Sequence, residues 1–156
     1  MSVELALYQP DFAHNAGAAL RLGACLGVRV HIIHPTGFPF SLKALRRGGL
    51  DYVERADFQE HVEFAAFESW RRAADRRLVL LTTGAETAVH AACYAPGDIL
   101  MLGRETAGVP APVAAAADLR VRIPMRPGLR SLNMATAAAL VLGEALRQTG
   151  GFAGLT

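Results

Sequence analysis

The sequence predicts a single α/β domain in which a mostly parallel sheet is flanked by helices. Short apolar runs that suit strands alternate along the chain with longer stretches that suit helices, and this alternation is typical of a parallel sheet. The chain has 156 residues, of which 52% are hydrophobic, so it can bury a sizeable core without disulfides or a structural metal. No repeat, linker or low-complexity tract interrupts it, so we assign residues 1–156 to one domain.

Five segments have the composition of strands. Residues 78–81 form a continuous apolar run, as expected for a strand covered on both faces. In residues 119–123 apolar side chains alternate with Arg120 and Arg122, which is the pattern of a half-buried strand. The predicted strands are 3–8, 28–34, 78–81, 99–102 and 119–123.

Helices are expected between these strands. Asn15 is placed to cap a helix that runs to about residue 26 and ends at Gly27, and Ser41 to cap a short basic helix over 42–47. The amphipathic pattern of 60–74 predicts a longer helix, and a weak one follows Pro110 to about residue 117. Residues 82–96 show no clear pattern.

The last predicted helix, 132–146, differs from the others because its first ten or so residues carry no charge. A helix that is apolar on every side is buried on every side. In a chain this short we expect a second copy to cover one of those sides, and therefore a homodimer. Small residues of the first helix form a plausible second part of that interface: Ala18, Ala19, Gly23 and Ala24.

The charged residues and the cysteines narrow the class of protein only a little. The formal net charge is +2, and every basic residue except Lys43 is arginine. Arginine suits phosphate groups, yet an arginine- and alanine-rich chain also fits a GC-rich genome. Cys25 and Cys93 lie far apart in apolar surroundings and are predicted to be buried thiols rather than a disulfide framework.

We expect a cytoplasmic protein with no membrane partner. The first residues begin a strand and lack a basic leader and a cleavage site. The longest apolar run, 134–143, falls well short of the roughly 20 residues that span a bilayer.

Several familiar kinds of site are absent from the sequence. His31 and His34 are predicted to point to opposite faces of one strand, and no other cluster has the spacing of metal ligands, so we expect no metal. Ser131 is not in a nucleophile elbow. Residues 103–108 begin like a phosphate-binding loop, but Val109-Pro110 follows where a Lys-Ser or Lys-Thr pair is required. A phosphorelay receiver would need an aspartate where the strand 78–81 ends in Thr82.

Three glycine- or proline-rich loops remain as the candidate site, because each follows a predicted strand. They are 82–84, 103–108 and 124–131. The carboxyl ends of parallel strands are where α/β proteins bind ligands, and such loops can offer backbone N–H and C=O groups to a flat, largely uncharged molecule. One such loop is ordinarily only a turn, but three in one small domain predict a ligand site.

Two charged residues have alternative interpretations. Arg21 is the only charged residue between Asp11 and Arg29, so it is either a solvated charge, or buried against a partner, or directed into a site. Glu105 either anchors its own loop through backbone N–H groups or takes part in the site.

A set of short motifs runs in order over nearly the whole chain. They are LYQP with NAGAALRLGACLGVRVHIIHP, LRRGGLDY, LLTTG, LGRETAGVP, IPM and SLNMATA. In this order and spacing they resemble the SPOUT-class RNA methyltransferases, specifically the small TrmL (YibK-like) branch. The resemblance implies a C-terminal trefoil knot and a homodimer that binds S-adenosylmethionine in the knot and methylates a ribose 2′-hydroxyl. The implied partner is tRNA rather than DNA, and the implied target is the wobble cytidine or modified uridine of leucine tRNAs.

The resemblance also implies roles for individual residues. Cofactor contacts are expected from Leu81, Thr82, Gly103, Ile123, Met125, Ser131 and Leu132. Catalytic and substrate roles are expected for Asn15, Arg21, Glu105 and Asn133. A base must first be free of its proton, and a guanidinium does not release its proton at ordinary pH. We therefore interpret Arg21 as a clamp on a phosphate or on the developing alkoxide.

Four positions depart from the pattern of the branch. Ala16, Ala107, Ala135 and Gly143 stand where a threonine, an arginine, a serine and a tyrosine are usual. Losing the arginine and the tyrosine together would weaken or redirect RNA binding. The alternatives are therefore the same chemistry on another tRNA or rRNA nucleotide, a non-catalytic knotted RNA-binding module, and an ordinary nucleotide-binding protein. Intact Asn15, Arg21 and Glu105 argue against the second, and the missing nucleotide-binding motifs against the third.

Overall fold

A computed structural model describes all 156 residues and shows one sheet of seven strands in the order β3-β2-β1-β6-β4-β7-β5. Every neighbouring pair is parallel. The strands are β1 (Glu4–Tyr8), β2 (Val30–Ile33), β3 (Phe58–His61), β4 (Leu78–Leu81), β5 (Thr87–Ala88), β6 (Ile99–Leu102) and β7 (Leu119–Arg122). The predicted α/β class is confirmed, and two of the five predicted strands have the predicted bounds.

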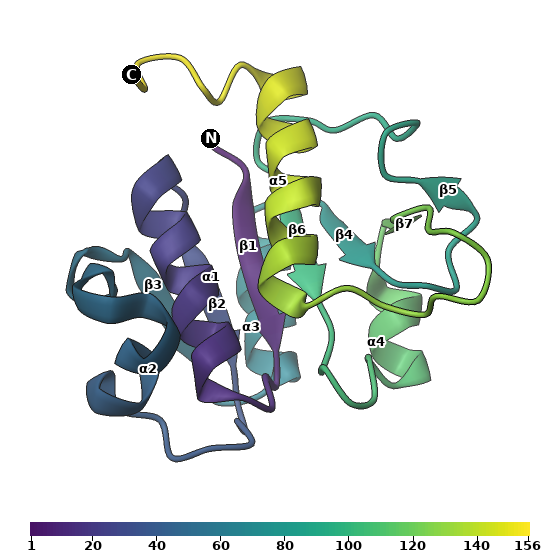
Figure 1. The fold of residues 1–156 in the computed structure, drawn as a ribbon. Coiled ribbons are helices and arrows are strands. Elements are labelled where there is room, and N and C mark those ends of the chain that lie inside the picture. Colours follow the sequence, from purple (N-terminus) through teal and green to yellow (C-terminus); the bar gives the residue numbers. More distant parts are fainter.

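Helices cover both faces of the sheet. They are α1 (Ala13–Leu26), α2 (Leu42–Gly49), α3 (Phe64–Ala73), α4 (Ala111–Ala116) and α5 (Met134–Thr149), with a 3-10 turn η1 (Leu50–Arg55). In Figure 1, α1 and α5 lie side by side in front of β1, and α3 lies behind the sheet. The larger cluster of buried residues, 24 in all, joins α1, α2 and α5 to the sheet, whereas 9 residues join α3 and α4 to it. The α1–α5 layer therefore contributes most of the core.

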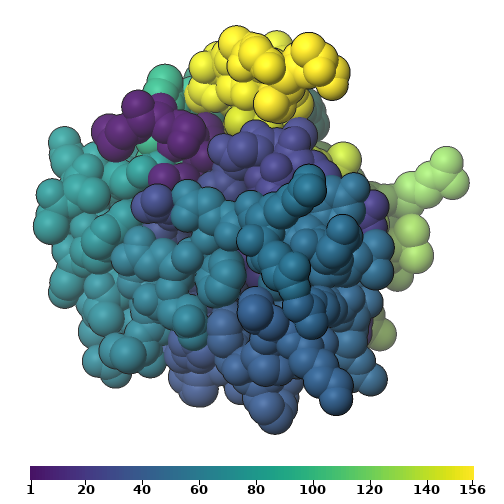
Figure 2. All heavy atoms as spheres, turned by 90° about the vertical axis from the view of Figure 1, so that its left-hand side faces the viewer, coloured from purple at the N-terminus to yellow at the C-terminus, as the bar shows by residue number.

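Glycines allow α1 and α2 to touch backbone to backbone. A Cβ placed on Gly17 would overlap the carbonyl oxygen of Leu45, and one placed on Gly48 would overlap that of His14. Only residues without side chains fit at these two contacts. As a result α2 lies directly against the first turns of α1, and Figure 2 shows it as part of the blue surface on that side of the molecule.

Three sequence-based predictions were wrong in detail. Asn15 does not cap α1, because the helix begins at Ala13. The first part of the predicted helix 60–74 belongs instead to the edge strand β3, which pairs with β2, so the helix starts at Phe64. Cys25 and Cys93 are exposed rather than buried. Edge pairing and the orientation of a helix surface depend on neighbours, which local patterns do not reveal.

The last helix is buried on one side only. Its buried side chains are Met134, Ala138, Val141, Leu142, Ala145 and Leu146. The opposite side includes Leu140, which is 48% exposed. No helix in the structure has both the length and the apolar character that crossing a membrane requires.

Candidate functional site

A pocket of about 300 Å³ opens where three loops meet at the carboxyl ends of β4, β6 and β7. Register explains why the loops meet there. Leu81 at the end of β4 lies opposite Leu102 of β6 on one side and Val121 of β7 on the other, so all three strands end at the same edge. The pocket is therefore at the edge where parallel α/β sheets bind ligands.

All seven residues that were predicted to contact a cofactor line this one pocket. They are Leu81, Thr82, Gly103, Ile123, Met125, Ser131 and Leu132. Of the predicted catalytic set, only Glu105 is among the lining residues. Residues of all three loops thus line the same pocket, as the interpretation of the loops as one ligand site requires.

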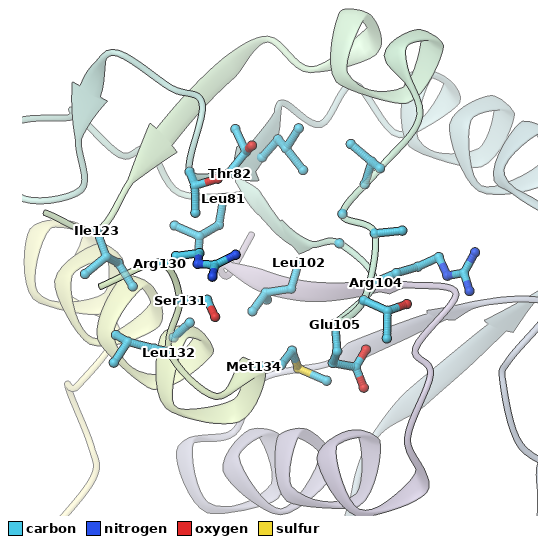
Figure 3. Close-up of a pocket in the computed structure, with 18 of the residues that line it drawn as sticks. Leu81, Thr82, Leu102, Arg104, Glu105, Ile123, Arg130, Ser131, Leu132 and Met134 are labelled. Atoms are coloured by element: carbon cyan, nitrogen blue, oxygen red, sulfur yellow. The ribbon is translucent and has the colours of Figure 1, made fainter. Parts of the chain in front are cut away.

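The lining is largely apolar with a few polar groups. Leu81, Leu102 and Ile123 surround the space, and Figure 3 shows the hydroxyl of Ser131 and the guanidinium of Arg130 among them. The guanidinium of Arg104, by contrast, points away from the pocket in the same view. Such a combination suits a ligand with a flat apolar part and a small number of charged or polar atoms.

Gly103 lets the second loop fold back tightly on itself. A Cβ at this position would come within 2.8 Å of the carbonyl carbon of Gly108. Arg104 and Gly108 exchange two backbone hydrogen bonds of 2.9 Å, which close the loop. Gly108 has a φ of 63°, which an ordinary side chain rarely adopts. The loop is thus a compact turn that presents backbone to the pocket.

Glu105 joins this loop to the start of α1. Its Oε1 accepts a hydrogen bond from the backbone N of Asp11 at 3.0 Å, and its Oε2 accepts one from the backbone N of Phe12, also at 3.0 Å. The side-chain Nδ2 of Asn15 donates to Oε2 at 3.3 Å. The carboxylate therefore caps a helix distant in sequence, where negative charge is favourable, rather than anchoring its own loop.

Asp11 strengthens the same junction from the other side. Its carboxylate accepts hydrogen bonds from the side chain of Arg104 and from both the backbone N and the hydroxyl of Thr106. Partial burial raises the pKa of Asp11, but the bonds from Thr106 and Arg104 outweigh that effect and hold the pKa below its ordinary value. The loop and the start of α1 are thus joined by two carboxylates, each with several donors.

Asn133 adds the third segment to this junction. Its Oδ1 accepts hydrogen bonds from the backbone N of Ala135 and of Thr136, so it is the N-cap of α5. Its Nδ2 donates to Oδ1 of Asn15 at 2.9 Å. Glu105, Asn15 and Asn133 therefore form one hydrogen-bonded series that connects the second loop, the start of α1 and the end of the third loop.

Arg21 lies apart from this series. Its guanidinium is 4.7 Å from the ring centroid of Tyr52 in η1, and it does not line the pocket. It follows Asn15 by six residues on α1, which places it about 9 Å farther along the helix axis. Within one chain, the structure brings together three of the four predicted catalytic residues and leaves out Arg21.

Sequence reasoning missed Asp11 and Arg130. Arg130 belongs to the arginine cluster that favoured a phosphate ligand, and its loop position after two prolines was the available signal. Asp11 carried no signal, because its donors come from residues more than 90 positions away. No group of three or more His, Cys, Asp or Glu side chains is arranged to hold a metal ion.

The sequence and the fold of this chain are similar to those of known RNA methyltransferases. The family described as SpoU rRNA Methylase matches residues 2–143. A tRNA (cytidine(34)-2'-O)-methyltransferase of Ancylobacter novellus is 53% identical over 98% of this chain and 97% of its own. A structure solved to give insight into the 2-OH methylation of C/U34 on tRNA has a TM-score of 0.88 at 37% identity, and the match covers 94% of this chain and 95% of that one.

More distant structures share the fold. An AdoMet-bound rRNA methyltransferase from Sinorhizobium meliloti has a TM-score of 0.85 at 27% identity. The match covers 94% of this chain and 56% of that one.

Proposed function

This chain belongs to the SpoU methylase family, and on that premise we propose that it transfers a methyl group from S-adenosylmethionine to the ribose 2′-hydroxyl of cytidine 34 in tRNA. The observation that carries the proposal is the convergence of three predicted loops on one pocket, in a chain that matches cytidine-34 enzymes over almost its full length. Uridine at the same position is the second candidate, because a similar solved structure concerns C/U34. Leucine tRNAs are the expected substrates from the sequence resemblance.

The residues of the pocket fit S-adenosylmethionine. The apolar side chains of Leu81, Ile123 and Leu132 would enclose the flat adenine, and the backbone of the 103–108 loop would provide hydrogen bonds. The guanidinium of Arg130 is suited to pair with the carboxylate of the methionine part. When bound, this cofactor supplies a methyl group already activated by its positive sulfonium.

Glu105 acts as a positioning residue in this proposal and not as the base. Its two carboxylate oxygens already accept three hydrogen bonds, from Asp11, Phe12 and Asn15. A carboxylate engaged in this way has little capacity left to accept the proton of a ribose hydroxyl. Its effect on the reaction is to hold the 103–108 loop and the start of α1 in one geometry. A fixed orientation of the groups around the substrate increases the rate.

Arg21 requires a second copy of the chain to take part in the reaction. Within one copy it lies over Tyr52, away from the pocket. Helix α5 lies next to α1. Its outward side, with Leu140 and Gly143, is open to a partner. We propose that two chains pair through these helices and that Arg21 of one chain clamps the substrate held by the other.

Two departures from the branch pattern affect the choice of substrate. Ala107 is exposed in the loop that lines the pocket, and Gly143 lies on the outward side of α5. Ala107 therefore removes a guanidinium that the branch usually has beside the pocket, whereas Gly143 lies on the side of α5 that we assign to the pairing of two chains. The rRNA alternative is less favoured, because a relative that is 53% identical over 98% of this chain is a tRNA (cytidine(34)-2'-O)-methyltransferase, whereas the Sinorhizobium rRNA enzyme is 27% identical.

The test is methyl transfer from labelled S-adenosylmethionine to bulk tRNA from a strain that lacks this modification, followed by mass-spectrometric mapping of the modified ribose. We expect 2′-O-methylcytidine at position 34 of leucine tRNAs. A label at another nucleotide would retain the chemistry and overturn the substrate. Cofactor binding without transfer to any RNA would overturn the catalytic proposal and favour a binding module.

A further inference from the structure

Phe12 is an exposed aromatic residue whose backbone is bonded to Glu105, one of the residues that line the candidate site. It is 44% exposed and precedes the first residue of α1. Single exposed apolar residues are common on protein surfaces and need no explanation by themselves. Phe12 differs in that its backbone N donates to Glu105, a residue that lines the pocket, so its backbone is fixed next to the site.

The ring of His14 stacks on Phe12. The two ring centroids are 5.6 Å apart and the ring planes differ by 19°, which is an offset stacked arrangement. His14 is also exposed. Together the two rings form a small aromatic surface that faces solvent. Neither ring stacks on any other aromatic side chain.

The basic helix α2 packs against the backbone of His14. Gly48 at the end of α2 touches the backbone of His14, so closely that a Cβ would not fit. Lys43 and Arg47 are exposed on the same helix and form no ion pair, while Arg46 is paired with Glu54. Leu45, Gly48 and Gly49 face α1, so Lys43 and Arg47 are two unpaired positive charges on a different face of α2 from the one that touches His14.

The two acidic groups nearby are both engaged by internal donors. Asp11, which precedes Phe12, is paired with Arg104. Glu105 keeps its negative charge, but its oxygens accept three hydrogen bonds from Asp11, Phe12 and Asn15.

We propose that Phe12 and His14 form a platform on which the base of the target nucleotide stacks while its ribose faces the pocket, and that the exposed Lys43 and Arg47 of the neighbouring helix α2 attract the phosphate backbone. This inference rests on the proposed methylation of RNA. Proteins recognise unpaired bases by stacking them on aromatic side chains, with neighbouring cations on the backbone. A nucleotide in a loop can present its base to the rings while its ribose remains beside the pocket.

The experiment compares Phe12→Ala, Phe12→Leu and Phe12→Trp in the full-length protein. The measured quantities are KM and kcat for an anticodon stem-loop, the Kd for S-adenosylmethionine by calorimetry, and the mass in solution by light scattering. Stacking contributes roughly 1–3 kcal/mol per base, so KM for the RNA is expected to rise at least about fivefold in Phe12→Ala and Phe12→Leu. Phe12→Trp is expected to retain the wild-type KM, and the cofactor Kd is expected to stay unchanged in all three.

A second substrate identifies the base. A stem-loop with an abasic target nucleotide removes the stacked group from the RNA, so Phe12→Ala is expected to have no further effect on the binding of that RNA. An unchanged effect of Phe12→Ala on the abasic RNA would overturn the proposal. So would a wild-type KM in Phe12→Leu, which would show that any apolar side chain suffices.

Two other outcomes separate this proposal from the ones it rests on. A change of mass in Phe12→Ala would assign the ring to an interface between copies and overturn the platform. If the wild-type protein methylates no RNA, the proposed function itself fails. If the wild-type protein methylates the stem-loop and Phe12→Ala does so equally well, the platform alone is wrong.

Discussion

The side-chain amide of Asn133 donates a hydrogen bond of 2.9 Å to Oδ1 of Asn15, across 118 positions of the sequence. The same Asn133 caps α5, and Asn15 in turn donates to Glu105. One series of side chains therefore sets the starts of both long helices and the position of the 103–108 loop. The shape of the pocket depends on this series, since two of its three loops are attached to it.

The two functions of Asn133 can be separated by substitution. Asn133→Ala removes both the cap and the bond to Asn15, and loss of the cap costs roughly 1 kcal/mol of folding free energy. Asn133→Asp keeps a cap acceptor but cannot donate to Asn15. We expect both variants to lose about tenfold or more in kcat/KM for methyl transfer, and only Asn133→Ala to lose about 2–4 °C in Tm. Wild-type activity in Asn133→Asp would show that the bond to Asn15 does not matter.

Arg21 can be tested without much disturbance of the fold. Its exposed contact with Tyr52 contributes about 0.5–1 kcal/mol, so Arg21→Ala is expected to stay folded. Loss of a clamp on the developing charge should lower kcat by about 100-fold, while the Kd for S-adenosylmethionine measured by calorimetry stays unchanged. An equal loss of cofactor affinity would contradict this role, and Tyr52→Phe, which retains the ring, provides the control.

The proposed pairing through α1 and α5 predicts the mass in solution. The wild-type chain is expected to have the mass of two subunits by light scattering at micromolar concentration. Leu140→Arg places a charge on the outward side of α5, where the side chain is 48% exposed in one copy, and is expected to shift the mass toward one subunit. Leu42→Arg is the matched control, because Leu42 is 46% exposed but lies on α2. An unchanged mass in Leu140→Arg would place the interface elsewhere.

The buried histidine pair predicts a loss of stability in acid. His31 and His61 are linked by a 2.9 Å hydrogen bond, and His31 also bonds to Glu4. Burial, with the adjacent His31, lowers the pKa of His61 from 6.5 to about 4. The unfolded chain therefore binds a proton in this window that the folded chain does not, so the free energy of unfolding should fall as the pH drops from about 6.5 to about 4.

Glu4 extends this loss to lower pH. Its burial raises the pKa, but the hydrogen bond from His31 and the charge of Arg76 more than offset that, and the net pKa lies below 4.5. Its contribution is present above pH 4.5 and is lost as the pH falls through the folded-state value. Urea titrations from pH 7 to below pH 4 would measure the combined effect. His61→Gln should show a smaller fall between pH 6.5 and pH 4.5, and a curve parallel to the wild type would refute the assignment to His61.

Two glycines make a matched test of helix packing. Gly17→Ala puts a methyl group into the carbonyl of Leu45, so α1 and α2 must separate, at a cost of about 1–3 kcal/mol in the free energy of unfolding. Gly143→Ala meets no atom within 4 Å and should instead gain about 0.5–1 kcal/mol from the higher helix propensity of alanine. Thermal unfolding of the two variants is expected to shift in opposite directions.

Much of the fold was determined by local patterns in the sequence. The buried strands β4 and β6 have the bounds that their continuous apolar runs predict, because strands covered on both faces of a parallel sheet need apolar side chains throughout. The pocket could be predicted as well, because three glycine- or proline-rich loops follow strands that must end at one edge. The roles of the individual pocket residues came from the resemblance and remain predictions.

Only the tertiary structure decided which distant side chains meet. Glu105 was as consistent with anchoring its own loop as with a place in the site, yet its partners are Asp11 and Phe12, more than 90 positions away. Arg21 had three open interpretations, and its contact is Tyr52. A hydrogen bond depends on where two chain segments lie in space to within an ångström, and no local periodicity carries that information. The sequence therefore determined the sheet and the loops, whereas packing of α1 against α2, α5 and the 103–108 loop determined the junction beside the pocket.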